Sequence, residues 1–122
     1  MVNNQETEGA VSTQFADDQF YRALAAQPRR RVLFYLIEED TASRAELARV
    51  LAGWRASKSE TMVPEEDHKE ILLQLYHTHL PCLAECELIQ YDRNAGTVTV
   101  ASLDPEVRQL IRWSVEAGSD SR

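Results

Sequence analysis

The sequence predicts a mainly α-helical chain that carries a small antiparallel β-hairpin. Apolar residues recur at helical spacing in several segments, which is typical of amphipathic helices. A capping box, SRAE at 43–46, marks the start of one of these helices. Two strand-like runs, 88–92 and 97–101, flank the turn RNAG at 93–96, which favours a hairpin. Helix, short strand, helix, helix and two-stranded ribbon is the element order of a winged helix-turn-helix. The expected fold class is therefore mainly α with a small β-wing.

The 122 residues are enough for one domain and too few for a second one. Residues 1–14 are polar and acidic and carry no apolar pattern, so we expect a disordered tail there and another at 118–122. The winged helix-turn-helix domain should span residues 15–117. The N-terminus lacks the apolar core of a signal peptide, and no apolar run reaches the roughly 18 residues of a membrane span. We therefore expect a cytoplasmic protein that does not bind a membrane.

The first two helices should lie near 15–25 and 28–40. The second opens with a proline, whose fixed φ suits the first turn of a helix. Three arginines, Arg29, Arg30 and Arg31, lie in that first turn, and acidic residues close the helix. Because both groups of charges oppose the helix dipole, packing must stabilise this helix. The apolar stripe that we expect to be buried consists of Val32, Leu33, Leu36 and Ile37.

The third helix should start at the capping box, where the Ser43 hydroxyl can accept a backbone N–H and the glutamate can reach back to the serine N–H. Gly53 should end this helix, and 54–64 should form a polar loop. In the fourth helix Pro81 interrupts the apolar pattern and removes a backbone donor, so we expect a kink near 76–80 or a break into two helices. The inner face of the fourth helix should consist of Ile71, Leu72, Leu75, His79 and Leu83.

A C-terminal helix, about 104–117, should begin at an aspartate cap that is followed by a proline. Its apolar surface is more than the winged core needs, so it must be buried elsewhere. One partner would be the first helix of the same chain, around Phe20, Tyr21 and Leu24. The other is the same helix of a second copy, and we favour this homodimer. The residues expected to form the dimer are Val107, Leu110, Ile111 and Trp113.

The charge of the chain is unusual for a protein that binds nucleic acid. Its net charge of −7 has the wrong sign for phosphate contacts, which normally come from a basic face. Of the 13 basic residues, only Lys58 and Lys69 are lysines. An acidic surface that is nearly free of lysine resembles the proteins of salt-loving archaea. In concentrated salt the attraction to phosphate weakens, so hydrogen bonds and close fit would supply more of any affinity for DNA.

From Arg30 to Val100 the chain resembles the winged helix-turn-helix of the ArsR-like regulators. In those proteins a helix-end signature, HLxxLxxAGLV, leads into the wing, and HLPCLAECELI stands here at 79–89. The chain is more closely similar to a small family of uncharacterised haloarchaeal domains with a PRRR first helix, an ELA helix and an HxHLPxL segment before a YD strand. The resemblance implies a homodimeric, DNA-binding transcription regulator. Glu87 stands where the signature usually has glycine, so that turn should have a different shape.

The resemblance also indicates which residues would contact DNA. The fourth helix starts with EEDHKE at 65–70, which would repel phosphate, so the contacts should come mainly from its later turns. Side chains that point away from the buried stripe can reach bases or phosphate, and the hairpin turn can reach a groove. The residues expected to bind double-stranded DNA are Gln74, His77, Thr78, Arg93 and Lys69. The alternative is a winged-helix module that binds a protein and no nucleic acid, and Arg29, Arg30 and Arg31 could contact such a partner.

One group of residues has ligand chemistry: His77, His79, Cys82 and Cys86. Residues 79, 82 and 86 can share a helical face, and imidazole with thiolate suits zinc. Their spacing matches no closed four-ligand site, however, and buried cysteine often acts as a small hydrophobe. We expect no metal and no cofactor, and leave metal or redox sensing as the alternative. The sequence has no Gly-rich phosphate loop, nucleophile elbow or metalloprotease motif, so we do not expect an enzyme.

Overall fold

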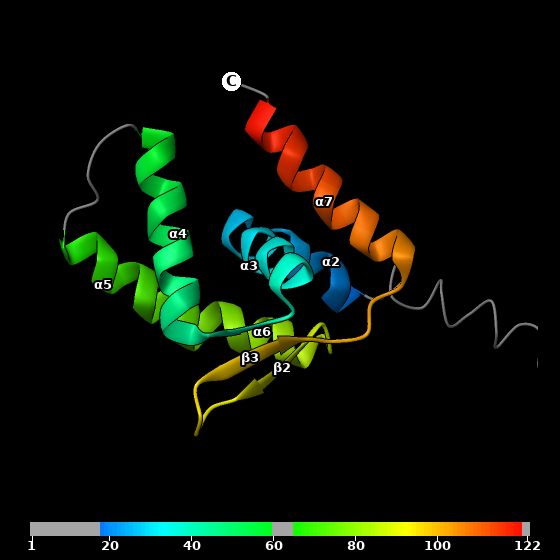
Figure 1. The fold of residues 1–122 in the computed structure, drawn as a ribbon, viewed down its shortest axis with the longest axis horizontal. Helices are drawn as coiled ribbons and strands as arrows, with labels where there is room; N and C mark the ends of the chain where they lie inside the picture. The colour runs from blue at the N-terminus through cyan, green and yellow to red at the C-terminus, as the bar shows by residue number, and fades with distance from the viewer. Residues whose placement is uncertain (1–17, 60–64, 121–122) are drawn as a thin grey trace, which may run out of the picture.

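The computed structural model describes residues 18–59 and 65–120. Its elements, in chain order, are α2 (Asp18–Leu24), α3 (Gln27–Glu39), β1 (Thr41–Ser43), α4 (Arg44–Ser59), α5 (Glu65–Gln74), the π-helical segment η1 (Leu75–His79), α6 (Leu80–Glu85), β2 (Ile89–Asp92), β3 (Thr97–Val100) and α7 (Pro105–Asp120). The fold is mainly α with a small antiparallel sheet and has the winged-helix order that the sequence predicts (Figure 1). The expected tail at 1–14 lies outside the described residues. At the other end α7 continues through 118–120, which we expected to be part of a tail.

The sheet has three antiparallel strands in the order β1-β3-β2. β1 pairs with β3, with Ala42 opposite Val98, and β2 pairs with β3 to form the wing. The wing turn is closed by backbone and side-chain bonds to Asp92, whose carbonyl accepts the N–H of Gly96 at 2.7 Å. Gly96 has φ +71°, a conformation in which glycine has no Cβ penalty. The predicted hairpin is therefore present.

Helix α3 lies at the centre of the molecule, with α4 on one side of it and α7 on the other (Figure 1). Its predicted stripe is buried, and Val32, Leu33 and Leu36 have no exposed surface. Burying a side chain of this size contributes about 1.5–3 kcal/mol, so packing can offset the unfavourable charge order of α3. In the described ranges no helix is both long and apolar enough to span a membrane.

The apolar stripe of α7 packs mainly on α3 of the same chain, whereas we had named residues of α2 as its partner within the monomer. Val107 and Ile111 have no exposed surface in the single chain. A second copy therefore has no access to these two residues of the expected dimer surface. Leu110 is half-buried, whereas Trp113 is 65% exposed. The physical reason is that α3 itself has a second apolar side that needs a cover, and α7 supplies it.

The prediction that Gly53 ends the third helix is wrong. α4 continues to Ser59, so much of the expected loop at 54–64 is helical. A glycine inside a helix costs only about 1 kcal/mol relative to alanine. The extra turn places Trp54 under the guanidinium of Arg31, which lies 4.9 Å from the ring centroid. This tertiary contact, which the local pattern does not contain, favours continuation of the helix.

At the place where Pro81 predicts a kink or a break, the α-helix is interrupted by the π-helical segment η1. The N–H of Leu80 donates to the carbonyl of Leu75, five residues earlier. Pro81, the next residue, lacks an N–H and its ring crowds the carbonyl four residues before it, which interrupts the α-helical hydrogen-bond pattern. The end of α6 then closes with bonds from Glu87 to Ala84 and from Leu88 to Leu83. This is a Schellman arrangement with Glu87 at the left-handed position, φ 63°. The glutamate thus keeps the shape that glycine usually provides there, which corrects our expectation of a different turn.

Candidate nucleic-acid interface

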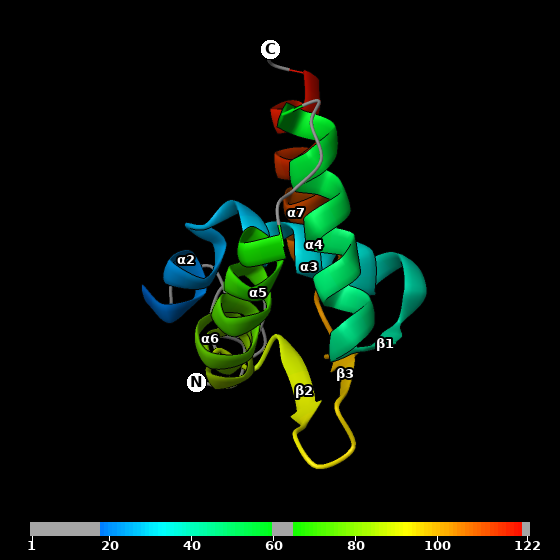
Figure 2. The ribbon, with the colours of Figure 1, turned by 90° about the vertical axis from the view of Figure 1, so that its left-hand side faces the viewer.

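Helix α5 and the β2–β3 wing lie on the same side of the molecule. Figure 2 looks at this side and shows α5 facing the viewer with the wing projecting below it, while α7 lies behind. In a winged helix-turn-helix, α4 and the α5–η1–α6 helix are the paired helices, and the second of them is the one that enters a DNA groove. The wing projects past the same face. The fold therefore brings the two elements that we expected to meet DNA into one surface.

The side chains that we expected to bind DNA are all exposed. Lys69, His77 and Thr78 lie on the outer side of α5 and η1, and Arg93 lies in the wing turn. Gln74 is also exposed, but its amide donates a hydrogen bond to the carboxylate of Glu70 at 3.0 Å. The Gln74 amide would therefore have to break this hydrogen bond, or use its remaining donor and acceptor, to bond to a base.

Arg44 connects the paired helices to the wing, a role that no local sequence pattern indicates. Its Nη1 donates to the Tyr91 hydroxyl at 3.1 Å and to the carbonyl of Arg93 at 3.2 Å. Its guanidinium also lies 5.0 Å from the ring centroid of Tyr76 in η1. The hydrogen bond with Tyr91 raises the pKa of Arg44 above its ordinary value, so the side chain stays charged. We call Arg44, Tyr76, Tyr91 and Arg93 the wing-base cluster.

The charge on this face is divided between its two elements. The start of α5 presents the exposed acids Glu66, Asp67 and Glu70 around Lys69. The wing base, by contrast, presents two guanidinium groups, because Arg93 also lies over the Tyr91 ring at 5.3 Å. Phosphate would thus be attracted to the wing base and repelled by the first turns of α5.

Comparison with known proteins gives a family for this chain. The family described as Domain of unknown function (DUF7344) has a model that matches residues 21–99. The chain belongs to this family. The search of curated proteins and the search of solved structures each returned no match. The matched range runs from α2 to β3, so it contains the paired helices and the wing and excludes α7.

Within the DUF7344 match, the three arginines of α3 are engaged inside the molecule. Arg29 donates to the carbonyls of Ala23 and Arg22, both at 2.9 Å, and Arg30 donates to the carbonyl of Leu24 at 2.6 Å. These carbonyls belong to the last turn of α2, where a cation is favoured, and the Arg22 carbonyl also accepts the N–H of Ala25. Arg31 lies over Trp54, and burial lowers the pKa of its guanidinium. The protein-binding role that we considered for them would have to compete with these contacts.

His79 and Cys86, which we considered as metal ligands, each contact a different part of the fold. His79 is buried, with its Nδ1 3.2 Å from Nη1 of Arg29. Cys86 donates its thiol hydrogen to the carbonyl of Gln19, and both cysteines are half-buried. Over residues 18–59 and 65–120 no three histidine, cysteine or acidic side chains are grouped so that they could hold a metal ion. His79 and Cys86 therefore serve the packing of α2 and α3 against η1 and α6.

Proposed function

We propose that this protein is a transcription regulator that binds double-stranded DNA as a winged helix-turn-helix, in the manner of the ArsR-like proteins. The later turns of the α5–η1 helix would enter a major groove, and the wing would contact the adjacent phosphates or minor groove. Gln74, His77 and Thr78 would face bases and phosphates, and Arg93 and Lys69 would supply charge.

The wing-base cluster is the observation that carries this proposal. Arg44 bonds to two groups of the wing and stacks on a side chain of η1, so the helix and the wing are held in one fixed relation. A protein that inserts a helix into one groove and a ribbon beside it needs such a relation before binding, because preorganisation lowers the entropic cost of association. The cluster also places positive charge where the wing would meet phosphate.

The first test measures binding to random duplex DNA by fluorescence anisotropy over a range of KCl concentrations. Each phosphate contact contributes roughly 0.9 to the slope of log K against log salt. Arg93→Ala should therefore lower the slope by about 1 and weaken binding evenly across sequences. Arg112→Ala is the matched control, because it removes the same charge from α7 on the opposite side. Absence of binding at low salt, or equal slopes for both variants, contradicts the proposal.

A second test addresses base reading. Genomic fragments enriched by the unmodified protein should bind the double variant Gln74→Ala, His77→Ala about tenfold more weakly, since one good base contact supplies about 1–3 kcal/mol of discrimination. Random duplex DNA should lose much less affinity. If enriched and random DNA lose affinity equally, these residues do not read bases.

A different observation favours the rival function, a module that binds a protein and no nucleic acid. Leu73 is 53% exposed in the last turn of α5, about one turn after the exposed acid Glu70. An exposed leucine beside carboxylates fits a partner surface with basic and apolar side chains. Leu73→Ala should weaken capture of such a partner and leave the salt slope on DNA unchanged.

We also propose that the protein forms a homodimer through the outer side of α7, which retains Trp113 and the half-buried Leu110 after Val107 and Ile111 are buried in the monomer. Trp113→Glu should then sediment as a folded monomer at tens of micromolar, a concentration at which the unmodified protein would be a dimer. A monomeric unmodified protein would refute this proposal.

A further inference from the structure

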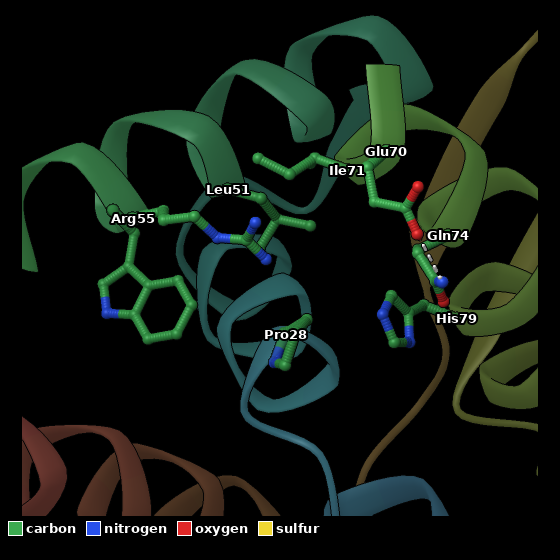
Figure 3. A pocket seen from close by; sticks show the side chains of 8 residues that line it. Pro28, Leu51, Arg55, Glu70, Ile71, Gln74 and His79 are labelled. Carbon is green, nitrogen blue, oxygen red and sulfur yellow. Dashed lines mark hydrogen bonds between the residues drawn. The ribbon is translucent and has the colours of Figure 1, made fainter. Parts of the chain in front are cut away.

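A cavity of about 270 Å³ lies between the start of α3, the middle of α4 and the junction of α5 with η1. Figure 3 shows its labelled side chains converging on one space, with Arg55 reaching in from α4 and Glu70 and Gln74 standing across from it. Apolar side chains of Pro28, Leu51 and Ile71 complete its wall. A volume near 300 Å³ is at the small end of ligand pockets, so the cavity fits a molecule of metabolite size.

Two opposite charges meet at this cavity without forming a pair. In the part of the chain that the structure describes, the Arg55 guanidinium has no hydrogen-bond or ion-pair partner. Glu70 accepts one bond, from the Gln74 amide, and has further acceptor capacity. A guanidinium binds a carboxylate in a bidentate manner, and a carboxylate can accept from an ammonium group. Arg55 on one side of the cavity and Glu70 on the other therefore suit the carboxylate and the ammonium group of a zwitterion.

His79, a further polar group at the cavity, is neutral. An arginine can only donate, so Nδ1 of His79 accepts from Arg29 and its hydrogen lies on Nε2. Burial, and then the charge of Arg29, lower the pKa of His79, so the ring is uncharged near neutral pH. The opposed charges at the cavity are therefore those of Arg55 and Glu70, and the ring adds one N–H donor beside them.

We propose that this cavity binds a small α-amino acid with an aliphatic side chain. Its carboxylate would meet Arg55, its ammonium would meet Glu70, and its side chain would lie against Leu51, Ile71 and Pro28. The ligand ammonium would compete with the Gln74 amide for the Glu70 carboxylate. The proposal goes beyond DNA binding and does not depend on it, because it concerns occupancy of the cavity alone.

The experiment is a titration of the nitrogen-labelled full chain with L-leucine, followed by NMR. The side-chain amide of Gln74 should shift with saturation, with a dissociation constant on the order of 1 mM, since both charged groups at the cavity are exposed to solvent. Two probes each lack one charge: 4-methylpentanoate lacks the ammonium, and 3-methylbutylamine lacks the carboxylate. Each should bind about tenfold more weakly than L-leucine, which corresponds to the loss of one charged contact.

Arg55→Gln and Glu70→Gln should each weaken L-leucine about tenfold. Arg49→Gln is the matched control, because Arg49 is exposed on the same helix and lies outside the cavity. The proposal is overturned if L-leucine produces no saturable shift, if Arg55→Gln binds as the control does, or if 4-methylpentanoate binds as tightly as L-leucine. None of these readouts includes DNA, so a failure here leaves the proposed function standing, and the reverse also holds.

Discussion

The arginines of α3 and those of the wing base have the same chemistry and opposite uses. At the start of α3, Arg29 and Arg30 reach back to the last carbonyls of α2, and Arg31 covers Trp54. At the wing, Arg93 stays exposed over the ring of Tyr91. The run of three arginines is the densest positive charge in the sequence, yet the fold uses it for internal contacts. Local charge density therefore does not locate the surface that attracts an anion. Arg29 and Arg30 turn inward because carbonyls at the end of α2 lie within reach and accept their hydrogen bonds.

The largest effect should follow loss of Arg29. Arg29→Ala removes bonds to two carbonyls of α2 and the contact with His79, and a bond from a charged donor contributes about 1.5–3 kcal/mol. We expect the free energy of unfolding to fall by about 2 kcal/mol in urea titration. The control is Arg22→Ala, which breaks an exposed ion pair with Glu85 and should cost at most about 0.5 kcal/mol. Equal losses in the two variants would remove the distinction between internal and surface arginines.

The burial of His79, together with its contact with Arg29, can be tested by pH because both lower the pKa of the ring. The folded pKa of His79 lies below its ordinary value of 6.5, so the unfolded chain takes up the proton first as the pH falls. Stability should therefore decrease as pH falls from about 6.5 toward the folded pKa, and should not respond to this group above 6.5. His79→Gln keeps an acceptor for Arg29 but cannot titrate, so its stability should depend less on pH over this range. His77→Gln, an exposed change in η1, is the control, and equal slopes for all three proteins would contradict this account.

The ends of α2 and α6 are closed in two different ways, and this difference predicts a smaller change in the free energy of unfolding. The end of α2 is closed by arginine side chains, whereas the end of α6 is closed by its own backbone, with Glu87 at φ 63°. Glycine at this position avoids the left-handed Cβ penalty, so Glu87→Gly should raise the free energy of unfolding by about 0.5–1 kcal/mol. The melting temperature should rise by a few degrees. A lower melting temperature would mean that the Glu87 side chain stabilises the turn by other contacts.

The smallest change in stability should come from the wing. Arg93→Ala removes an exposed side chain, so its free energy of unfolding should stay within about 0.5 kcal/mol of the unmodified protein. The same variant should show the reduced salt slope on DNA. A loss of stability close to that of Arg29→Ala would show that the wing arginine, too, serves the fold.

Much of the architecture could be predicted because it follows from local rules. The Ser43 hydroxyl accepts the N–H of Glu46 at 3.0 Å, as a capping box requires. The Glu46 carboxylate accepts a hydrogen bond from Tyr35 in place of the Ser43 N–H that a full capping box would use. Pro81 disturbs the helix at the place expected, and Gly96 takes the positive φ of the wing turn. Caps, prolines and glycines act within a few residues, so the sequence alone determines them.

The tertiary structure decided what depends on residues far apart in the chain. Gly53 stays inside a helix because the ring of Trp54 contacts the guanidinium of Arg31. Val107 and Ile111 of α7 are buried in the core because they cover an apolar side of α3. Arg44 connects to Tyr91 across 47 positions, and Arg29 to His79 across 50. No local pattern records such pairs, since each partner is an ordinary residue of its own segment. The sequence therefore determined the order of the helices and the wing, and the packing of those elements decided which charges are left at the surface to bind another molecule.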